Sequence, residues 1–208
     1  IAKKFTYAKG ALASTISLVY NGQSGNPFSY TYSNGPVRDQ GTSETNDLIF
    51  IPTADQIRAM TFVSNSTFPL SAAQQAAALE NYIAQDNYLS KNRGKYAERN
   101  GARLPFTNII DVKFVQDFNV KIYNKKYQFQ LTYDVFNFTN MLNRNWGRTY
   151  FMANDQYSLM RYQGATGSTV PSYSFSPVAN NTPWGISSST APSYSARWVS
   201  QLGLRFKF

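Results

Sequence analysis

The sequence predicts an all-β fold built from about five long antiparallel strands, and three observations support this prediction. Apolar and polar residues alternate with a period of two in several segments, as they do in strands that have one face in apolar surroundings. Two of these segments are much longer than the about 5–6 residues of an ordinary strand. The connections between the segments alternate between short and long.

The first two strands are expected near residues 1–8 and 12–22. The first places Phe5 and Tyr7 on one face, and the second places Ile16 and Leu18 on one face with hydroxyl side chains opposite. Lys3 shares the face of Phe5, which is expected to be apolar. Either its ammonium group extends to a polar boundary or a bulge lies upstream.

The third and fourth strands are expected near residues 107–122 and 127–140. In the third, every even position from Ile110 to Ile122 is apolar except Gln116. In the fourth, every odd position from Tyr127 to Val135 is apolar. The alternation changes phase after Val135, which a bulge or the emergence of the strand from an apolar layer would explain.

The fifth strand is expected near residues 196–208, where apolar side chains alternate with polar ones up to Phe208. Strands of this length suit a membrane crossing, which takes about 9–11 residues and more if the strand projects beyond the bilayer. Short turns at one end and long loops, 23–103 and 143–195, at the other are typical of an outer-membrane barrel with extracellular loops. Aromatic residues near the turn ends suit the membrane interface.

The alternation assigns the residues of such a barrel to two sides. The apolar faces are expected to meet lipid, and the opposite faces to line the interior. The expected lumen-facing residues are Asp111, Lys113, Asp117, Lys121, Gln128, Gln130, Asp134 and Arg205. These residues suit packing against an internal domain and contact with a ligand equally well.

Composition excludes several classes of function. The 208 residues include no Cys and no His, so disulfides, thiol catalysis and the commonest metal ligands are absent. We expect no metal site, no cofactor and no enzymatic activity, because paired catalytic carboxylates, a phosphate-binding Gly-rich loop and a nucleophile elbow are missing. The net charge of +9 is spread along the chain and forms no Lys/Arg run, so nucleic-acid binding is not expected.

The two long loops contain one helix signal and one region rich in Tyr, Trp, Asn and Ser. The segment 71–88 is rich in Ala and Gln, and its first residue, Ser71, is a good N-cap. This pattern predicts a small helix lying on a loop. The composition of the second loop suits contact with a sugar or a peptide, and it suits ordinary loop packing as well. Tyr30 and Tyr32 are expected to continue the second strand.

Several stretches resemble one family of membrane proteins. The stretches "YQFQLTYDVFNFTNMLNRNWGRTYF", "RWVSQLGLRFKF", "TISLVYNGQSGNPFSY" and "LPFTNIIDVKFVQDF" resemble the C-terminal end of TonB-dependent outer-membrane proteins of Bacteroidota type. The branch with which they agree best is Oar-like, whose members carry a carboxypeptidase-regulatory-like domain, and it is related to SusC-like proteins. The resemblance implies a bacterial outer-membrane location and a barrel of about 22 strands with a plug domain.

The resemblance also implies partners that lie outside this sequence. They are the remainder of the barrel and its plug, TonB through an N-terminal region, and the lipid and lipopolysaccharide of the outer membrane, with a surface lipoprotein as a further possible partner. The sequence is accordingly expected to be the C-terminal piece of a longer chain that imports a substrate, which the residues do not identify. The last strand resembles the β-signal that directs barrel assembly, carried by Trp198, Leu202, Leu204, Phe206 and Phe208.

Two alternatives remain open from the sequence. A barrel of another class, either a passive channel or a structural or secretion-associated protein, would show the same strands. A soluble β-sandwich that binds a ligand would also alternate and use Tyr and Phe.

Overall fold

The computed structural model describes residues 1–36, 45–123, 125–164, 170–178, 181–186 and 196–207, and most of its regular structure is β-strand. The chain divides into two compact units. Unit 1 comprises Ile1–Gly25, Pro105–Phe151 and Ile186–Phe208, and unit 2 comprises Asn26–Leu104 and Met152–Gly185. Unit 2 therefore consists of segments that were expected to be loops.

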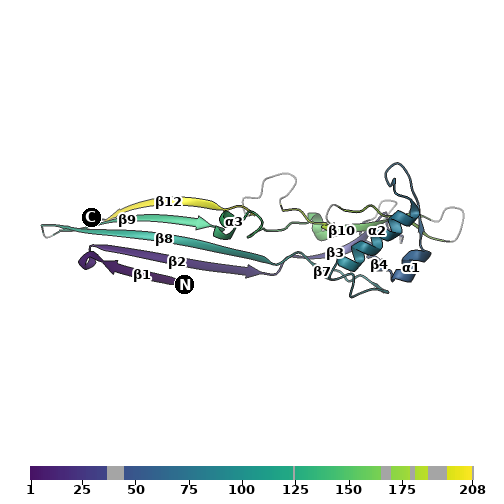
Figure 1. The fold of residues 1–208 in the computed structure, drawn as a ribbon, viewed down its shortest axis with the longest axis horizontal. Coiled ribbons are helices and arrows are strands. Elements are labelled where there is room, and N and C mark those ends of the chain that lie inside the picture. The colour runs from purple at the N-terminus through teal and green to yellow at the C-terminus, as the bar shows by residue number, and fades with distance from the viewer. Residues whose placement is uncertain (37–44, 124, 165–169, 179–180, 187–195, 208) are drawn as a thin grey trace. The chain divides into compact units, whose positions relative to one another are not determined.

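Unit 1 contains one antiparallel sheet with the strand order β1-β2-β8-β9-β12, drawn side by side in Figure 1. Its strands are β1 (Ala2–Tyr7), β2 (Leu12–Gln23), β8 (Thr107–Ile122), β9 (Lys125–Phe136) and β12 (Val199–Lys207). Each strand pairs with the one that precedes it in this set. The sheet is open, because among the described residues β1 and β12 each pair along one edge only.

The register keeps the two faces of this sheet separate across all five strands. Phe114 of β8 lies opposite Ile16 on β2 and Tyr133 on β9, and Tyr133 lies opposite Leu202 on β12. Because side chains alternate along a strand, this single row fixes the orientation of every other row.

Strand β9 is shorter than the sequence predicts, because it ends at Phe136 and not near residue 140. Asn137 has a φ of 56°, in the left-handed region that Asn tolerates better than most residues. The short helix α3 (Phe138–Leu142) follows. The change of phase after Val135 therefore comes from the chain leaving the sheet, and not from a bulge.

Unit 2 has a mixed five-stranded sheet with the order β5-β11-β10-β3-β7 and a separate pair, β4 and β6. Tyr30 and Tyr32 belong to its β3 and do not extend β2 as expected, and β3 pairs in parallel with β10. The strands are β3 (Pro27–Ser33), β4 (Phe50–Ile51), β5 (Thr61–Phe62), β6 (Lys95–Tyr96), β7 (Ala102–Arg103), β10 (Gln156–Gly164) and β11 (Ser172–Ser174). The helices are α1 (Ala54–Ala59) and α2 (Ala72–Gln85).

Helix α2 begins where the sequence predicts. The hydroxyl of Ser71 accepts a hydrogen bond from the Gln74 N–H, and the Gln74 side chain accepts one from the Ser71 N–H, which forms a capping box. The helix does more than lie on a loop, because its buried residues Leu79, Tyr82 and Ile83 belong to the core of unit 2.

Tyrosine rings form much of this core. The fully buried Tyr30 hydroxyl donates to Asp86 Oδ2 at 2.7 Å, and its ring stacks on Tyr88 and meets the rings of Phe28 and Tyr157 edge-on. Burial, followed by the nearby Tyr82 and Asp86, raises the pKa of Tyr30 far above its ordinary value. Burial also raises the pKa of Tyr82, and it raises the pKa of Tyr157 to about 12.

One buried amide connects three segments of unit 2. Gln75 on α2 is fully buried, and its Nε2 donates to the carbonyls of Val63 and Leu70 at 3.1 and 2.9 Å. Its Oε1 accepts from the Phe175 N–H at 2.9 Å. A buried polar side chain is tolerated when its hydrogen bonds are made, and this one joins α2 to the chain on both sides of it.

We predict that Gln75→Leu destabilises unit 2 by about 1–3 kcal/mol, because the buried Phe175 N–H loses its acceptor. Hydrogen exchange of the Phe175 amide should accelerate, and the thermal unfolding of the protein, followed by near-ultraviolet circular dichroism, should shift to lower temperature. The matched variant Asn81→Leu changes an exposed position of the same helix and should leave both readouts nearly unchanged. Equal effects of the two variants would contradict this role of Gln75.

A second prediction concerns alkaline pH. A phenol whose pKa is higher in the folded state stabilises the fold fully below its unfolded pKa of 10.0, and that contribution is lost as the pH rises toward the folded value, about 12 for Tyr157. Unit 2 should therefore lose stability above pH 10, with tyrosinate absorbance of the buried rings appearing as it unfolds. Tyr157→Phe removes one phenol that must ionise on unfolding, so it should raise the pH midpoint of this unfolding. An unchanged midpoint would argue that the raised pKa of Tyr157 does not contribute to the loss of stability.

Candidate functional site

The polar face of the sheet in unit 1 carries ion pairs between strands. Lys113 Nζ on β8 lies 3.3 Å from Asp134 Oδ1 on β9. Asp117 is buried, accepts a hydrogen bond from Gln130 Nε2 at 2.7 Å, and has Lys4 Nζ of β1 at 3.9 Å. These contacts connect β1, β8 and β9 across one face.

The eight residues predicted to face a lumen all share this face by register. Asp111 accepts a hydrogen bond from the Asn137 N–H at 2.8 Å, so it holds the end of β9. Arg205 lies opposite Gln130. Lys121 and Gln128 lie near the turns, where they line a cavity of about 860 Å³ together with Lys9, Lys126 and Lys207, and none of the described residues that line it is acidic.

The opposite face of the sheet is apolar and exposed. Leu202, Leu204 and Phe206 lie opposite Tyr133, Leu131 and Phe129 of β9, as the alternation predicts. Trp198 is exposed directly before β12, and Phe208 is outside the described residues. The other exposed apolar side chains of this face are Phe5, Tyr7, Ile16, Leu18, Tyr20, Val120 and Ile122.

Most polar groups on the apolar face are satisfied within the sheet. Gln116 Oε1 accepts from the Ser14 hydroxyl at 2.6 Å and from the Tyr7 hydroxyl at 3.0 Å. Gln116 Nε2 donates to the carbonyls of Ala13 and Asp117. Lys3, the residue that disturbed the predicted pattern, has its ammonium group 5.4 Å from the centre of the Phe5 ring.

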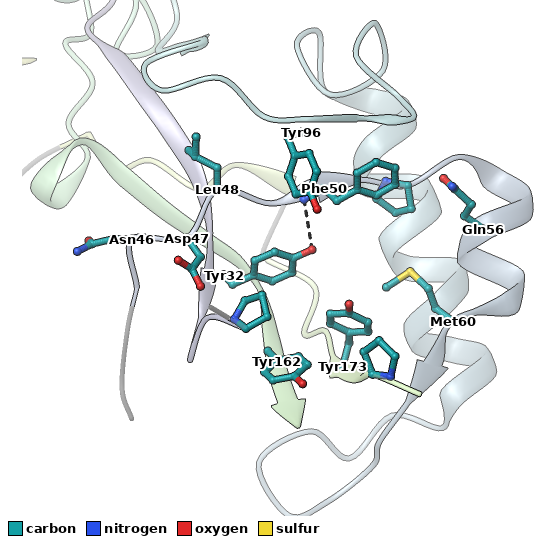
Figure 2. Close-up of a pocket in the computed structure, with 13 residues that line it drawn as sticks. Tyr32, Asn46, Asp47, Leu48, Phe50, Gln56, Met60, Tyr96, Tyr162 and Tyr173 are labelled. Carbon is teal, nitrogen blue, oxygen red and sulfur yellow. Dashed lines mark hydrogen bonds between the residues drawn. The ribbon is translucent and has the colours of Figure 1, made fainter. Parts of the chain in front are cut away.

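Unit 2 contains an aromatic pocket of about 800 Å³ (Figure 2). Five strands each supply one ring. The rings are Tyr32 from β3, Phe50 from β4, Tyr96 from β6, Tyr162 from β10 and Tyr173 from β11, and the other lining residues are Pro36, Asn46, Asp47, Leu48, Pro52, Gln56, Met60 and Pro171.

Tyr32 is held in place at the centre of this pocket. Its ring stacks on Tyr173 with centroids 6.0 Å apart, and its hydroxyl accepts a hydrogen bond from the Phe50 N–H at 3.2 Å. Figure 2 shows the ring between Phe50 and Tyr96 on one side and Tyr162 and Tyr173 on the other. The edge-to-face pairs Phe50–Tyr96 and Tyr162–Tyr173 complete the walls.

Asp47 is the one charged residue among the described residues that line the pocket, and its carboxylate lies beside the Tyr32 ring in Figure 2. Burial raises the pKa of Tyr32, to which Tyr173, Tyr96 and Asp47 add. Burial, with Tyr162 and Tyr96 nearby, also raises the pKa of Tyr173, so both phenols stay neutral.

A smaller polar pocket of about 490 Å³ shares Asn46 and Leu48 with the aromatic one. Its other lining residues are Ser29, Thr31, Arg99, Asn100, Asn154, Asp155 and Gln156. The chain from Asn46 to Leu48 therefore borders a mostly aromatic space and a polar one.

Sequence reasoning did not identify the aromatic pocket. Its residues are in segments expected to be loops, although the enrichment of Tyr in those segments had suggested a contact with a ligand as one possibility. The usable signal was the run "PFSYTYS" in β3, in which Phe28, Tyr30 and Tyr32 alternate with hydroxyl residues. Such alternation of β-favouring residues indicates a strand and not a loop. The structure then shows that the five residues between Pro27 and Ser33 are buried on both faces.

Within the described residues, no group of three or more acidic side chains could hold a metal ion. No helix in that part of the chain is long and apolar enough to cross a membrane. No protein-family model, no curated protein and no solved structure matches this chain. Its function is therefore inferred from the sheet of unit 1 and the pocket of unit 2.

Proposed function

We propose that this chain is the C-terminal part of the barrel of a TonB-dependent outer-membrane transporter. One observation carries the proposal, namely the exposed apolar face that runs in register across five antiparallel strands, with an ion-paired polar face behind it. Lipid hydrocarbon suits the first face, and the water or protein inside a barrel suits the second.

The dimensions of the apolar face support a membrane crossing. On β8 the apolar residues run from Ile110 to Ile122, 12 positions later, which is about 40 Å at about 3.3 Å per residue. A strand tilted by about 45° covers about 28 Å of membrane thickness over that length, close to the about 25 Å apolar band of outer-membrane barrels.

Aromatic side chains lie at both ends of this face. Tyr20 lies opposite Ile110 at one end. Trp198 directly precedes Val199, which lies opposite Phe136 at the end of β9. At the other end the rings of Phe118 and Phe129 are 5.7 Å apart, and those of Tyr127 and Phe206 are 6.2 Å apart. Aromatic girdles at both interfaces are characteristic of these barrels.

The edges of the sheet favour a larger assembly. In lipid, each backbone group without a partner at an open edge costs several kcal/mol, so β1 and β12 need neighbouring strands. Further strands of the same barrel would supply them. Trp198, Leu202, Leu204, Phe206 and Phe208 would then belong to the closing strand that guides assembly.

The connectivity supports an extracellular role for unit 2. Both short connections, β1–β2 and β8–β9, leave one end of the sheet, and both long ones, β2–β8 and β9–β12, leave the other. In outer-membrane barrels the long connections are extracellular. Unit 2, which is built from them, would capture the substrate.

In this proposal the transport step follows the scheme that the family resemblance implies. Energy reaches the barrel through TonB, which acts on an N-terminal region, and displaces a plug domain so that the captured substrate enters the periplasm. The polar face with Lys113, Asp117, Gln130 and Asp134 would contact the plug. Other expected partners are outer-membrane lipid and lipopolysaccharide, with a surface lipoprotein as a further possible partner.

We predict that Leu202→Arg strongly reduces the amount of folded protein in the outer membrane, because a basic side chain at the middle of the lipid face costs about 2–4 kcal/mol. The matched variant Gln201→Arg places the same side chain on the polar face, opposite Asp134, and should be tolerated. Heat-modifiable migration in outer-membrane fractions measures both. Normal assembly of both variants, or recovery of the wild-type protein as a soluble monomer without detergent, would contradict the membrane assignment.

The transport mechanism needs a separate test. The complete protein purified in detergent should bind the periplasmic domain of TonB, and it should not conduct ions in a planar bilayer while its plug is in place. Steady conductance without TonB binding would identify a passive channel. Absence of both activities in a correctly assembled barrel would favour a structural or secretion-associated protein.

A further inference from the structure

We propose that the turn end of the sheet in unit 1 binds the phosphate group of an anionic phospholipid. The site is the cavity of about 860 Å³ that Lys9, Lys121, Lys126 and Lys207 line. The inference rests on the proposed function in one respect, which is that the apolar face of this sheet lies in lipid.

The strand register brings three of these lysines together. Lys121 of β8 lies directly opposite Lys126 of β9. Lys207 of β12 lies opposite Gln128, which is two residues after Lys126 on the same face of β9. Three adjacent strands therefore supply positive charge to one end of the polar face.

The turn between β1 and β2 supplies the fourth lysine. This turn contains the short 3-10 segment η1 (Ala8–Gly10), and Asn119 of β8 holds it in place. Asn119 Nδ2 donates to the Gly10 carbonyl at 3.2 Å, and the Asn119 N–H donates to the Ala11 carbonyl at 2.7 Å. These two bonds fix the turn against β8, so Lys9 lines the same cavity as Lys121.

The charge of the lining selects an anion. All four lysines are exposed, no ion pair between described residues includes any of them, and none of the described lining residues is acidic. The nearby residues outside the described ranges, Asn124 and Phe208, have uncharged side chains. Like charges that face each other across two strands, as Lys121 and Lys126 do, destabilise a sheet. A phosphate between them offsets this cost, and lysine is a common phosphate ligand.

The position of the cavity favours a phosphate that is carried by a lipid. Val120 and Tyr127 also line it, and these two residues lie opposite each other on the apolar face. The Tyr127 ring stacks on Phe206 of the same face, with centroids 6.2 Å apart. The cavity thus lies where the apolar face ends and cationic side chains begin, which in a bilayer is the level of the headgroups.

The topology and the size of the cavity define the ligand further. Both short connections leave this end of the sheet, and the short turns of outer-membrane barrels are periplasmic. The lipid therefore belongs to the leaflet that faces the periplasm. A volume of about 860 Å³ is within the about 300–1,000 Å³ of small-molecule sites, so a glycerophosphate headgroup fits it.

The test uses the complete protein purified in non-ionic detergent and three soluble probes. Dihexanoyl phosphatidylglycerol carries a net negative charge, dihexanoyl phosphatidylcholine has the same chains and no net charge, and inorganic phosphate has no chains. Isothermal titration should show phosphatidylglycerol binding at least about tenfold more tightly than either other probe. The reason is that several lysines attract its net charge while its chains contact the apolar face.

Two variants connect the binding to the facing lysines. The double variant Lys121→Gln with Lys126→Gln should weaken phosphatidylglycerol binding about tenfold or more and leave phosphatidylcholine binding unchanged. The single variant Lys126→Glu places opposite charges across the two strands, so it should weaken this binding while the thermal stability is kept or rises. The matched control, Lys91→Gln with Lys95→Gln, removes two exposed lysines of unit 2 outside the lining and should bind as the wild type does.

Four results would overturn the inference. They are equal binding of the two lipids, inorganic phosphate binding as tightly as phosphatidylglycerol, unchanged lipid binding in the double variant at the facing lysines, and a hexaglutamate peptide binding more tightly than phosphatidylglycerol. The last result would assign the cavity to an acidic protein segment.

These outcomes are independent of the assembly and TonB tests. Phosphatidylglycerol binding by a protein that does not bind TonB would contradict the proposed function alone. An assembled barrel that binds TonB and does not bind phosphatidylglycerol would contradict this inference alone.

Discussion

The common register of five strands is the constraint on which unit 1 depends. Side chains alternate strictly along a strand, so a slip of one residue in β12 would move Leu202, Leu204 and Phe206 to the polar face. The same slip in β9 would separate Lys113 from Asp134 and Gln130 from Asp117. A slip in register therefore costs free energy in two ways, because apolar side chains move to the polar face and polar contacts between strands are lost. Both costs favour the same register for the whole sheet.

Unit 2 depends on a different constraint, because its core contains many tyrosines whose polar hydroxyl groups are buried. A buried hydroxyl or amide is costly unless it has a partner, and here Tyr30 donates to Asp86 while Gln75 joins Val63, Leu70 and Phe175. With these partners in place the rings provide a rigid core. The same strands, β3, β10 and β11, also supply Tyr32, Tyr162 and Tyr173 to the pocket, so core and candidate binding site share one scaffold.

The sequence predicts unit 1 better than unit 2, and the physical reason is locality. Alternation with a period of two is a property of each strand, so it indicates the strands and the face of residues such as Asp117 and Leu204 without knowledge of their neighbours. The helix cap at Ser71 is local as well. The end of β9 depends on the backbone conformation of Asn137, which alternation does not reveal. In β3 the rings of Phe28, Tyr30 and Tyr32 alternate with hydroxyl residues, but this alternation does not show that both faces are buried or that β3 pairs with β10 and does not extend β2. The pocket brings together Tyr32, Phe50, Tyr96, Tyr162 and Tyr173, and no local pattern connects these five.

The parallel pairing of β3 with β10 sets an order of folding. Tyr30 and Tyr157 are neighbours in unit 2 but are separated along the chain by the whole of β8 and β9. Strands β8 and β9 are close in sequence and pair locally, whereas β3 must close a long loop of chain to reach β10. Until that loop closes, β3 lacks β10 as a partner, and an aromatic strand with an unpaired edge is prone to misfolding.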